Sequence, residues 1–287
     1  MPSQKKTRVP TQFALTYPFS RPQLVQILRG VVISTNVDDL ASEDKRIAYF
    51  RPISQLSIGQ IKSMPYYGLG GGLLTPDYQL SQFGTHALKN DPLLSYSSTQ
   101  WLIHYHMSAP HGPGPLYWHK LVCKWLHSGE EFTGSELEAD ITEVDTAQRG
   151  RPLSSRSIKS ARGAFTSTYI NDDGLASLGI LTSPIKGRYL VLEPDPPSVW
   201  VFGLALLDFW RARYGFDRLT INLDDLSAPG GLGDIFLIGG GRINQYLRRL
   251  QEEGYVEVYR LAPPYQVVLR RHDAEPLLEK LYAVDDD

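Results

Sequence analysis

The sequence predicts a mainly α-helical protein with short β wings, in which tandem winged helix-turn-helix modules pack around a central helical pair. Three observations lead to this prediction. Apolar residues recur at the i, i+3/i+4 and i+7 spacing of a buried helix face in residues 91–126. The order helix, glycine-rich connection, strand, turn and strand is predicted for residues 53–84 and again for residues 198–271. A hydrophobic content of 42% with 21% charged residues is typical of a soluble globular protein.

The composition also limits the classes of function. A net charge of −2 over 287 residues gives no overall field that attracts nucleic acid or an anionic membrane, so phosphate contacts must come from local clusters of cations. The single cysteine, Cys123, excludes an intramolecular disulfide and a multi-cysteine zinc site, and its apolar neighbours favour an inert thiol over a nucleophile. No stretch reaches the roughly 18 continuous apolar residues of a membrane span, and the N-terminus has no hydrophobic signal segment. We therefore expect a cytoplasmic protein without membrane contact.

Residues 1–50 are predicted to contain a basic N-terminal arm and a first helix. The arm is residues 1–12, and residues 23–33 have a helical period. In the acidic connection that follows, Asp39 precedes Glu43-Asp44-Lys45 in the Asp…Glu-x-Lys order of metal-dependent nucleases. The spacing is too short for such a site and the lysine lacks an apolar strand context, so we interpret these residues as a connection only.

The module of residues 51–127 is predicted to begin as a winged helix. Residues 54–64 have the pattern of a capped helix, and a glycine-rich connection leads to two short strands, of which the second is at residues 78–84. Glycines in such a loop can bind phosphate. However, Gly68-Leu69-Gly70-Gly71-Gly72-Leu73 lacks the last glycine of the dinucleotide fingerprint, and no Gly-Lys-Ser/Thr follows, so a flexible turn is the better interpretation.

The central helical pair occupies residues 91–126. Asp91-Pro92 is predicted to open the first helix, and the second helix follows a turn at residues 109–114. His104 and His106 are two residues apart on a helix, so their side chains diverge by about 200° and cannot share one metal ion. We interpret the histidines of this pair as packed beside tryptophans and donating to backbone carbonyls.

Residues 128–195 are predicted to form a basic helical module with a short hairpin. Ser135 and Glu138 have the spacing of a capping box, and Lys186-Gly187 has the pattern of a hairpin turn. The window from Gln148 to Ile170 has no acidic residue and contains five cations, namely Arg149, Arg151, Arg156, Lys159 and Arg162. Interleaved hydroxyl residues and a preceding turn favour contact with DNA phosphates, whereas a charged run by itself is often only a solvated face.

Three prolines near residue 195 mark a domain boundary, and residues 196–287 are predicted to form a C-terminal winged helix-turn-helix. Its expected elements are a helix at 199–214, a strand and helix start at 220–226, a helix at 241–253 and strands at 255–260 and 266–271. The candidate DNA-binding residues on its last helix and wing are Arg242, Gln245, Arg248, Arg249, Arg260, Arg270 and Arg271. Because glutamates lie among them and many winged helices dock proteins, protein binding remains an alternative for this module.

The middle of the chain resembles a bacterial family of domains of unknown function. The runs Tyr78-Gln79-Leu80-Ser81-Gln82-Phe83-Gly84, Asp91-Pro92-Leu93-Leu94 and Thr99-Gln100-Trp101-Leu102-Ile103-His104-Tyr105-His106 are similar, in this order, to its Leu-Thr-Glu-Phe-Gly, Asp-Pro-Tyr-Leu-Glu-Asp and Leu-Trp-Leu-Leu-His series. The likeness covers most of residues 50–210. Such families are encoded in phage-defence islands, often beside sulfur-transfer genes that resemble those for DNA phosphorothioation. The resemblance implies this context and no catalytic residues.

Two departures from the family pattern accompany this resemblance. The family's amino-terminal motif, Gly-His-Glu-Thr-Phe, is replaced by residues 13–19, and its Glu-Asp pair is replaced by Ser95-Tyr96-Ser97. An activity that depended on either motif would be absent from this chain.

We therefore expect a non-enzymatic protein that binds double-stranded DNA as an accessory or targeting subunit of a phage-defence or DNA-modification system. No catalytic residue, cofactor site or metal site is predicted, and the expected partners are double-stranded DNA and other subunits of the defence system. The DNA hypothesis requires the cations of the separate modules to form one continuous positive strip. The near-neutral charge and 16 tyrosines favour an alternative, a protein–protein scaffold, and a third hypothesis is a winged-helix transcription regulator.

Overall fold

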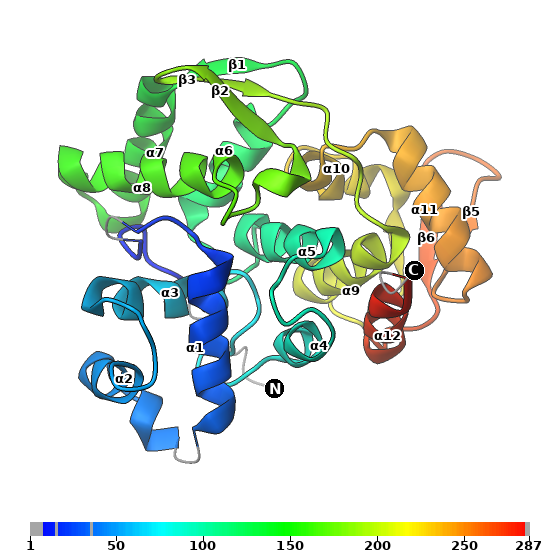
Figure 1. Cartoon of the computed structure of the whole chain (residues 1–287). Helices are drawn as coiled ribbons and strands as arrows, with labels where there is room; N and C mark the ends of the chain where they lie inside the picture. Colours follow the sequence, from blue (N-terminus) through cyan, green and yellow to red (C-terminus); the bar gives the residue numbers. More distant parts are fainter. Residues whose placement is uncertain (1–7, 15–16, 35–36, 285–287) are drawn as a thin grey trace.

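The computed structural model describes residues 8–14, 17–34 and 37–284. Within them the protein is mainly helical, with two small antiparallel sheets of three strands each (Figure 1). The α-helices are α1 (Arg21–Ile33), α2 (Glu43–Phe50), α3 (Ile58–Gly70), α4 (Gln82–Asn90), α5 (Ser97–Ser108), α6 (Leu116–Trp125), α7 (Gly134–Arg149), α8 (Ser155–Ile170), α9 (Val199–Tyr214), α10 (Leu232–Phe236), α11 (Gly240–Glu252) and α12 (Glu275–Val284). The strands are β1 (Glu131–Thr133), β2 (Leu181–Ile185), β3 (Arg188–Val191), β4 (Thr220–Asn222), β5 (Val256–Tyr259) and β6 (Gln266–Leu269). The short 3₁₀ helices are η1 (Val37–Leu40), η2 (Ala176–Leu178) and η3 (Leu223–Leu226).

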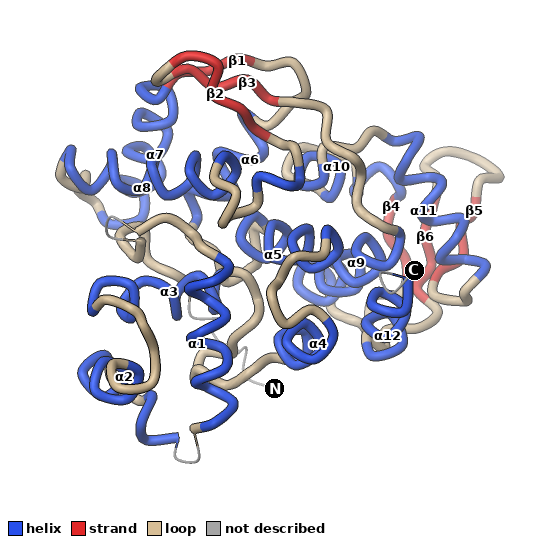
Figure 2. Tube along the Cα trace, viewed as in Figure 1, coloured by secondary structure: helices blue, strands red, loops and turns tan. Residues whose placement is uncertain are grey.

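Helix α5 lies at the centre of the molecule, where it contacts α6, α9 and α10 (Figure 1). Every residue of α5 from Ser98 to Tyr105 is buried. Two of the three tryptophans of the central pair, Trp101 and Trp118, are also buried, and Trp125 is partly buried. The remaining elements surround this centre, and Figure 2 shows the two sheets at separate edges of the molecule with helices between them. The predicted central pair is therefore the architectural hub.

The start of α5 differs from the prediction for a chemical reason. The helix begins at Ser97 instead of Asp91. The Asp91 side chain is buried and accepts hydrogen bonds from the backbone nitrogens of Ser95 (2.8 Å) and Tyr96 (2.9 Å). This carboxylate therefore organises the turn that leads into the helix, because it satisfies two backbone donors that would otherwise be buried without partners.

Two segments of the chain have the same order of strands and helices. In the first, residues 131–191, β1 is followed by α7, α8, β2 and β3, and the strand order in the sheet is β1-β3-β2. In the second, residues 220–269, β4 is followed by α10, α11, β5 and β6, and the strand order is β4-β6-β5. We name these segments the first and second sheet units. In both units the last strand lies between the other two, and α8 and α11 occupy equivalent places in the chain order.

Several local predictions are confirmed and others are wrong. The hairpin turn at Lys186-Gly187 is confirmed between β2 and β3. The strand predicted at residues 78–84 is wrong, because the Ser81 hydroxyl accepts a hydrogen bond from Gly84 N and caps α4, which leaves only an isolated bridge at Leu74 and Leu80. In the structure Glu43 and Asp44 open α2, where an acidic connection was predicted.

The capping box of α7 is also displaced from its predicted position. Thr133, two residues before Ser135, accepts from Glu136 N, and the Glu136 carboxylate accepts from Thr133 N at 2.8 Å. Thr133 ends strand β1, so its backbone is already extended as an N-cap requires. The predicted Ser135–Glu138 box is therefore wrong by two residues.

The described part of the N-terminal arm is not a free arm. The Arg8 guanidinium donates to the carbonyls of Gly114 and Pro110, and Val9 N donates to Pro113 O at 2.8 Å. Burial lowers the pKa of Arg8. The segment from residue 8 therefore packs against the turn of the central pair, whereas residues 1–7 of the predicted arm lie outside the described residues.

Among the helices of the described residues, none combines the length and the apolar character that crossing a membrane requires.

Candidate nucleic-acid interface

Helix α8 carries the central cations of the most basic window in the sequence. The Ser154 hydroxyl caps the helix by accepting a hydrogen bond from Ser157 N at 3.2 Å. The inner face buries apolar residues such as Phe165 and Tyr169, while Arg156 and Lys159 are exposed on the outer face. The burial of the inner face fixes which side of the helix meets solvent, so the cations project outward from a rigid element.

A groove of about 610 Å³ runs between α8 and the N-terminal segment. The wall from the N-terminal segment is Gln12, Tyr17 and Pro18. The wall from α8 includes Arg156, Lys159, Ser160, Gly163 and Ser167. No carboxylate lines this groove among the described residues, so its two cations and its hydroxyl groups give it a positive, hydrogen-bonding character within a molecule of net charge −2.

The five predicted cations of this region fall into two groups. Arg149 Nη1 lies 3.8 Å from the Asp145 carboxylate, and Arg162 Nη1 lies 3.4 Å from the Glu138 carboxylate. The other three cations form no ion pair with any carboxylate of the described residues, and they are Arg151, Arg156 and Lys159. Only these three keep a full charge available for an external anion, because a neighbouring carboxylate offsets most of the field of a paired arginine.

Three of the six predicted cations of the second sheet unit and its flank form ion pairs with carboxylates. Arg249 lies 3.0 Å from Glu252 and 3.2 Å from Glu253, and Arg271 lies 2.7 Å from Asp273. Arg270 pairs with Glu257. Arg260 donates a hydrogen bond to Asn244 Oδ1 at 2.7 Å, and the Arg242 guanidinium lies 6.0 Å from the centre of the Tyr246 ring. Gln245 and Arg248 are exposed. The bond from Arg270 lowers the pKa of Glu257, so this carboxylate stays ionised and its pair stays closed at neutral pH.

The twelve predicted DNA-binding residues do not form one surface. Helices α8 and α11 lie on opposite sides of the molecule, separated by the central helices (Figure 1). The single positive strip expected from the sequence is therefore wrong. The structure brings Arg156 and Lys159 together at the groove and leaves Arg242, Gln245 and Arg248 on a separate face.

The family model for proteins of unknown function named DUF4007 matches residues 38–282. The chain belongs to the DUF4007 family. This confirms the resemblance to a family of domains of unknown function and extends it beyond residues 50–210 in both directions. No curated protein has a matching sequence.

Two crystal structures of SspB, one of them bound to a magnesium ion, are similar to this DUF4007 chain in fold. Each aligns with a TM-score of 0.72 and 15% sequence identity, over 94% of this chain and 86% of the SspB chain. At this identity the likeness establishes the arrangement of helices and sheets only. It shows that the two sheets and the helices between them form one known architecture.

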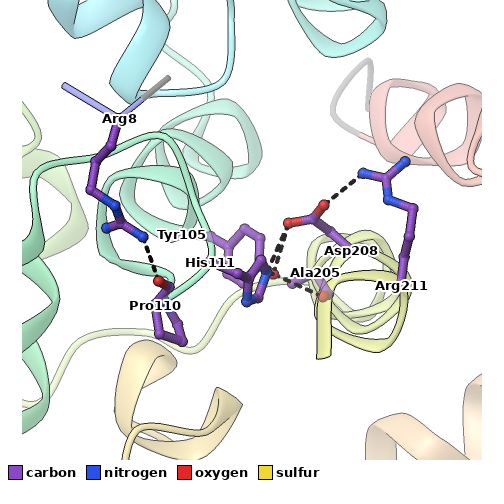
Figure 3. A network of polar contacts seen from close by, with 7 residues as sticks. All are labelled: Arg8, Tyr105, Pro110, His111, Ala205, Asp208 and Arg211. Atoms are coloured by element: carbon purple, nitrogen blue, oxygen red, sulfur yellow. Dashed lines mark hydrogen bonds and ion pairs between the residues drawn. The ribbon is translucent and has the colours of Figure 1, made fainter. Parts of the chain in front are cut away.

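A polar network at the centre of the DUF4007 fold was not predicted from the sequence (Figure 3). The Asp208 carboxylate on α9 receives hydrogen bonds from Tyr105 OH (3.2 Å), from the His111 ring (3.0 Å) and from Arg211 (2.7 Å). Burial raises the pKa of Tyr105 well above its ordinary value, so its hydroxyl remains a donor. No local sequence pattern predicts this network, because Tyr105 and Asp208 are 103 residues apart in the chain. It ties α9 to the central pair.

The buried histidine of α5 has the role expected from the sequence. His104 Nε2 donates to Ile235 O at 2.6 Å, and Nδ1 therefore accepts from Tyr169 OH at 2.8 Å. The ring lies edge-on to Trp101, and burial lowers the pKa of His104 to about 4, so the ring is neutral. Within the described ranges, no three His, Cys, Asp or Glu side chains are grouped to hold a metal ion. Burial raises the pKa of Cys123 to about 12, which agrees with the expectation of an inert thiol.

Proposed function

We propose that this DUF4007 protein is a non-enzymatic subunit that binds double-stranded DNA through α8. The observation that carries the proposal is the groove at α8, where Arg156 and Lys159 face solvent without carboxylate partners among the described residues. Ser157 and Ser160 lie beside them. Arginine, lysine and serine side chains on one helix face are the groups that proteins use to contact DNA phosphates.

We interpret both sheet units as winged helix-turn-helix modules. A strand, two helices and a hairpin whose last strand lies in the middle of the sheet support this interpretation for each unit. In such modules the second of the two helices is the one that enters the major groove, and α8 and α11 hold that position. The groove at α8 favours the first unit as the DNA-binding one, because Arg156 and Lys159 line it together with hydroxyl groups and no carboxylate of the described residues. On α11, Arg249 is paired with Glu252, and Arg242 and Arg248 are exposed without a comparable groove beside them among the described residues.

Gel-shift titration of a duplex of about 20 base pairs at two salt concentrations tests the proposal. We expect the double variant Arg156→Ala/Lys159→Ala to weaken binding and to lower the slope of log affinity against log salt concentration by about two units, one per lost phosphate contact. The matched control is Arg270→Ala/Arg271→Ala, which removes the same charge from residues paired with Glu257 and Asp273. Absence of binding to any duplex at low salt, or an equal effect of the control variant, contradicts the proposal.

The non-enzymatic part of the proposal has its own test. Supercoiled plasmid is incubated with the protein and magnesium, the ion present in one of the SspB structures. We expect the plasmid to stay supercoiled. Nicking that disappears in the double variant Asp39→Ala/Glu43→Ala would show that the Asp…Glu-x-Lys residues act as a nuclease site and would overturn this part.

The second sheet unit favours a second candidate function, docking of another protein subunit. The end of β5 and the connection to β6 expose Tyr259 (40%), Leu261 (98%) and Tyr265 (40%), and an apolar surface of this kind is common in protein interfaces. The scaffold function is supported if a second protein co-purifies with this one, if Leu261→Ser abolishes that binding and if charge reversal at Arg248 and Arg249 does not. It also requires that this protein has no affinity for DNA.

The biological setting is part of the proposal. The family resemblance favours an accessory or targeting subunit of a phage-defence or DNA-modification system of the phosphorothioation kind. A winged-helix transcription regulator is the alternative setting, and it requires a symmetric dimer on a palindromic site. Analytical ultracentrifugation distinguishes the two settings, because a protein that is monomeric in solution cannot be the dimeric transcription regulator.

A further inference from the structure

The groove beside α8 is larger than phosphate contact requires. Its volume of about 610 Å³ is in the range of pockets that enclose small molecules, roughly 300–1,000 Å³. Arg156 and Lys159 are in the first turns of α8, whereas the groove continues to Ser167, about 12 Å beyond Lys159 along the helix axis. A phosphate group would occupy only the cationic end, so the rest of the groove is available for another part of the same ligand.

Gly163 shapes the middle of this groove without serving the packing of the protein. A glycine in the middle of a helix destabilises the helix relative to alanine. At helical glycines that packing requires, a side chain would collide: a Cβ at Gly30 would lie 2.4 Å from the Phe50 ring, and a Cβ at Gly68 would lie 2.8 Å from Leu74. A Cβ at Gly163 meets nothing within 4 Å. Neighbouring atoms therefore do not require a glycine here, and its absence of a side chain leaves this part of the groove open.

The opposite wall presents an aromatic ring in a fixed place. Tyr17 N donates to Ala14 O at 2.8 Å, and Tyr67 OH donates to Tyr17 O at 3.1 Å. The Tyr17 ring lies against Gly59 of α3, where an added Cβ would be 2.2 Å from the ring. A ring that is held before a ligand arrives loses little freedom on binding and offers a flat face for stacking.

Uncharged polar groups complete the lining of the groove. The Ser160 hydroxyl oxygen is buried and has no hydrogen-bond partner among the described residues. Gln12 Nε2 donates to Ser157 Oγ at 3.1 Å and so joins the two walls at one point. A buried hydroxyl without a partner is unfavourable, and a ligand with a donor or acceptor at this depth would satisfy it.

We propose that the groove binds one nucleotide unit, with its phosphate at Arg156 and Lys159 and its base between Tyr17 and Gly163. The chemistry that the groove recognises is a nucleoside monophosphate, either within a DNA strand or free in solution. This inference rests on the proposed function for the first of these sources, and it means that the protein binds an unstacked nucleotide more tightly than a base in an intact duplex.

Fluorescence anisotropy with three probes tests the inference, namely an intact duplex, the same duplex with a one-nucleotide bulge and a free deoxynucleoside monophosphate as competitor. A bulged nucleotide is already unstacked, so it enters the groove without the cost of extrusion. We expect roughly tenfold tighter binding of the bulged duplex than of the intact duplex.

Gly163→Leu is the variant that separates the groove from the cations. The leucine fills the groove while Arg156 and Lys159 remain, so we expect it to abolish the preference for the bulge and to leave the affinity for the intact duplex and its salt slope unchanged. Gly241→Leu on α11 is the matched control, because a Cβ there also meets nothing within 4 Å and the site lies outside the groove. A thermal unfolding midpoint of Gly163→Leu no lower than that of the unmodified protein verifies that it folds.

The outcomes distinguish this inference from the proposed function. Equal affinity for the two duplexes, no competition by the monophosphate and no effect of Gly163→Leu overturn the nucleotide pocket and leave duplex binding intact. If the protein binds neither duplex but binds a fluorescently labelled deoxynucleoside monophosphate, and Gly163→Leu abolishes that binding, the DNA proposal is overturned and the free nucleotide is the ligand. Binding of none of the three probes overturns both.

Discussion

His104 shows how one buried side chain makes the stability of this protein depend on pH. Burial lowers its pKa from 6.5 to about 4. Between these two values the unfolded chain binds a proton that the folded protein does not bind, so stability decreases as the pH falls through this window. Both nitrogens of the ring are engaged, by Tyr169 and Ile235, which leaves no place for a second proton without breaking a hydrogen bond.

We expect the free energy of unfolding to fall by up to about 3 kcal/mol between about pH 6.5 and about pH 4 because of His104. His104→Gln removes this titration, and the difference between the two proteins isolates it from the carboxylates that titrate in the same range. Urea unfolding at a series of pH values measures the effect. If the two proteins lose stability in parallel as the pH falls, His104 is not protonated on unfolding and the assignment is incorrect.

At the residue scale, the sequence predicted the neighbours of His104 better than those of Asp208. The tryptophan contact and the carbonyl acceptor follow from a histidine on the apolar side of a buried helix. The donors to Asp208 come from α5, from the turn of the central pair and from α9. Such a convergence has no local pattern, because it depends on how α5 and α9 pack.

At the scale of elements, the glycines of the helices divide into those that packing requires and those that it does not. Gly30 in α1 faces the buried Phe50 ring, and Gly163 in α8 faces open space. Both are in helix interiors, so the same substitution has the same effect on helix propensity and a different effect on packing.

We expect Gly163→Ala to stabilise the protein by up to about 1 kcal/mol, since alanine is the better helix former and meets no neighbour. Gly30→Ala is expected to destabilise it by about 1–3 kcal/mol, because the added methyl group overlaps the ring of Phe50. Chemical denaturation of the two variants measures both signs. A destabilised Gly163→Ala would mean that an unseen contact fills the groove, and the argument for an open ligand site would fail.

Element boundaries show what local sequence can decide. The hairpin turn at Lys186-Gly187 was predicted, because a glycine at positive φ specifies such a turn within a few residues. The cap of α7 was predicted two residues too late, since both Thr133 and Ser135 are good capping residues and the choice between them is made by strand β1. A strand that ends at Thr133 pairs with β3, which is more than 50 residues away, so no short window contains the deciding contact.

At the scale of the whole molecule, the predicted modules share one core. The boundaries at residues 50, 127 and 195 cut across contacts between α1 and α3, between α5 and α9, between α6 and α10 and between α4 and α12. The hydrogen bond from His104 to Ile235 and the network at Asp208 also cross them. The buried residues of the described chain form one continuous cluster.

We therefore expect a single cooperative unfolding transition, because no module can lose its structure without exposing apolar surface of its neighbours. Tryptophan fluorescence reports mainly on the hub and far-ultraviolet circular dichroism on all helices, so their denaturation curves are expected to coincide. Two separated transitions, or an isolated fragment of residues 196–287 that unfolds cooperatively by itself, would show that the modules are independent.

The sequence by itself determined the mainly helical character, the central pair, the hairpin turn at Lys186-Gly187 and the most basic helix, because each of these depends on residues within about one or two turns of one another. Only the tertiary structure decided which cations are available and where they face. Carboxylates from α7, from the neighbouring strand and from the same helix pair with Arg162, Arg270 and Arg249, and the central helices place α8 and α11 on opposite sides. The second wall of the groove comes from Gln12, which is 145 residues from its partner Ser157. Contacts over such separations are set by the packing of the core, so no local pattern in the chain could reveal them.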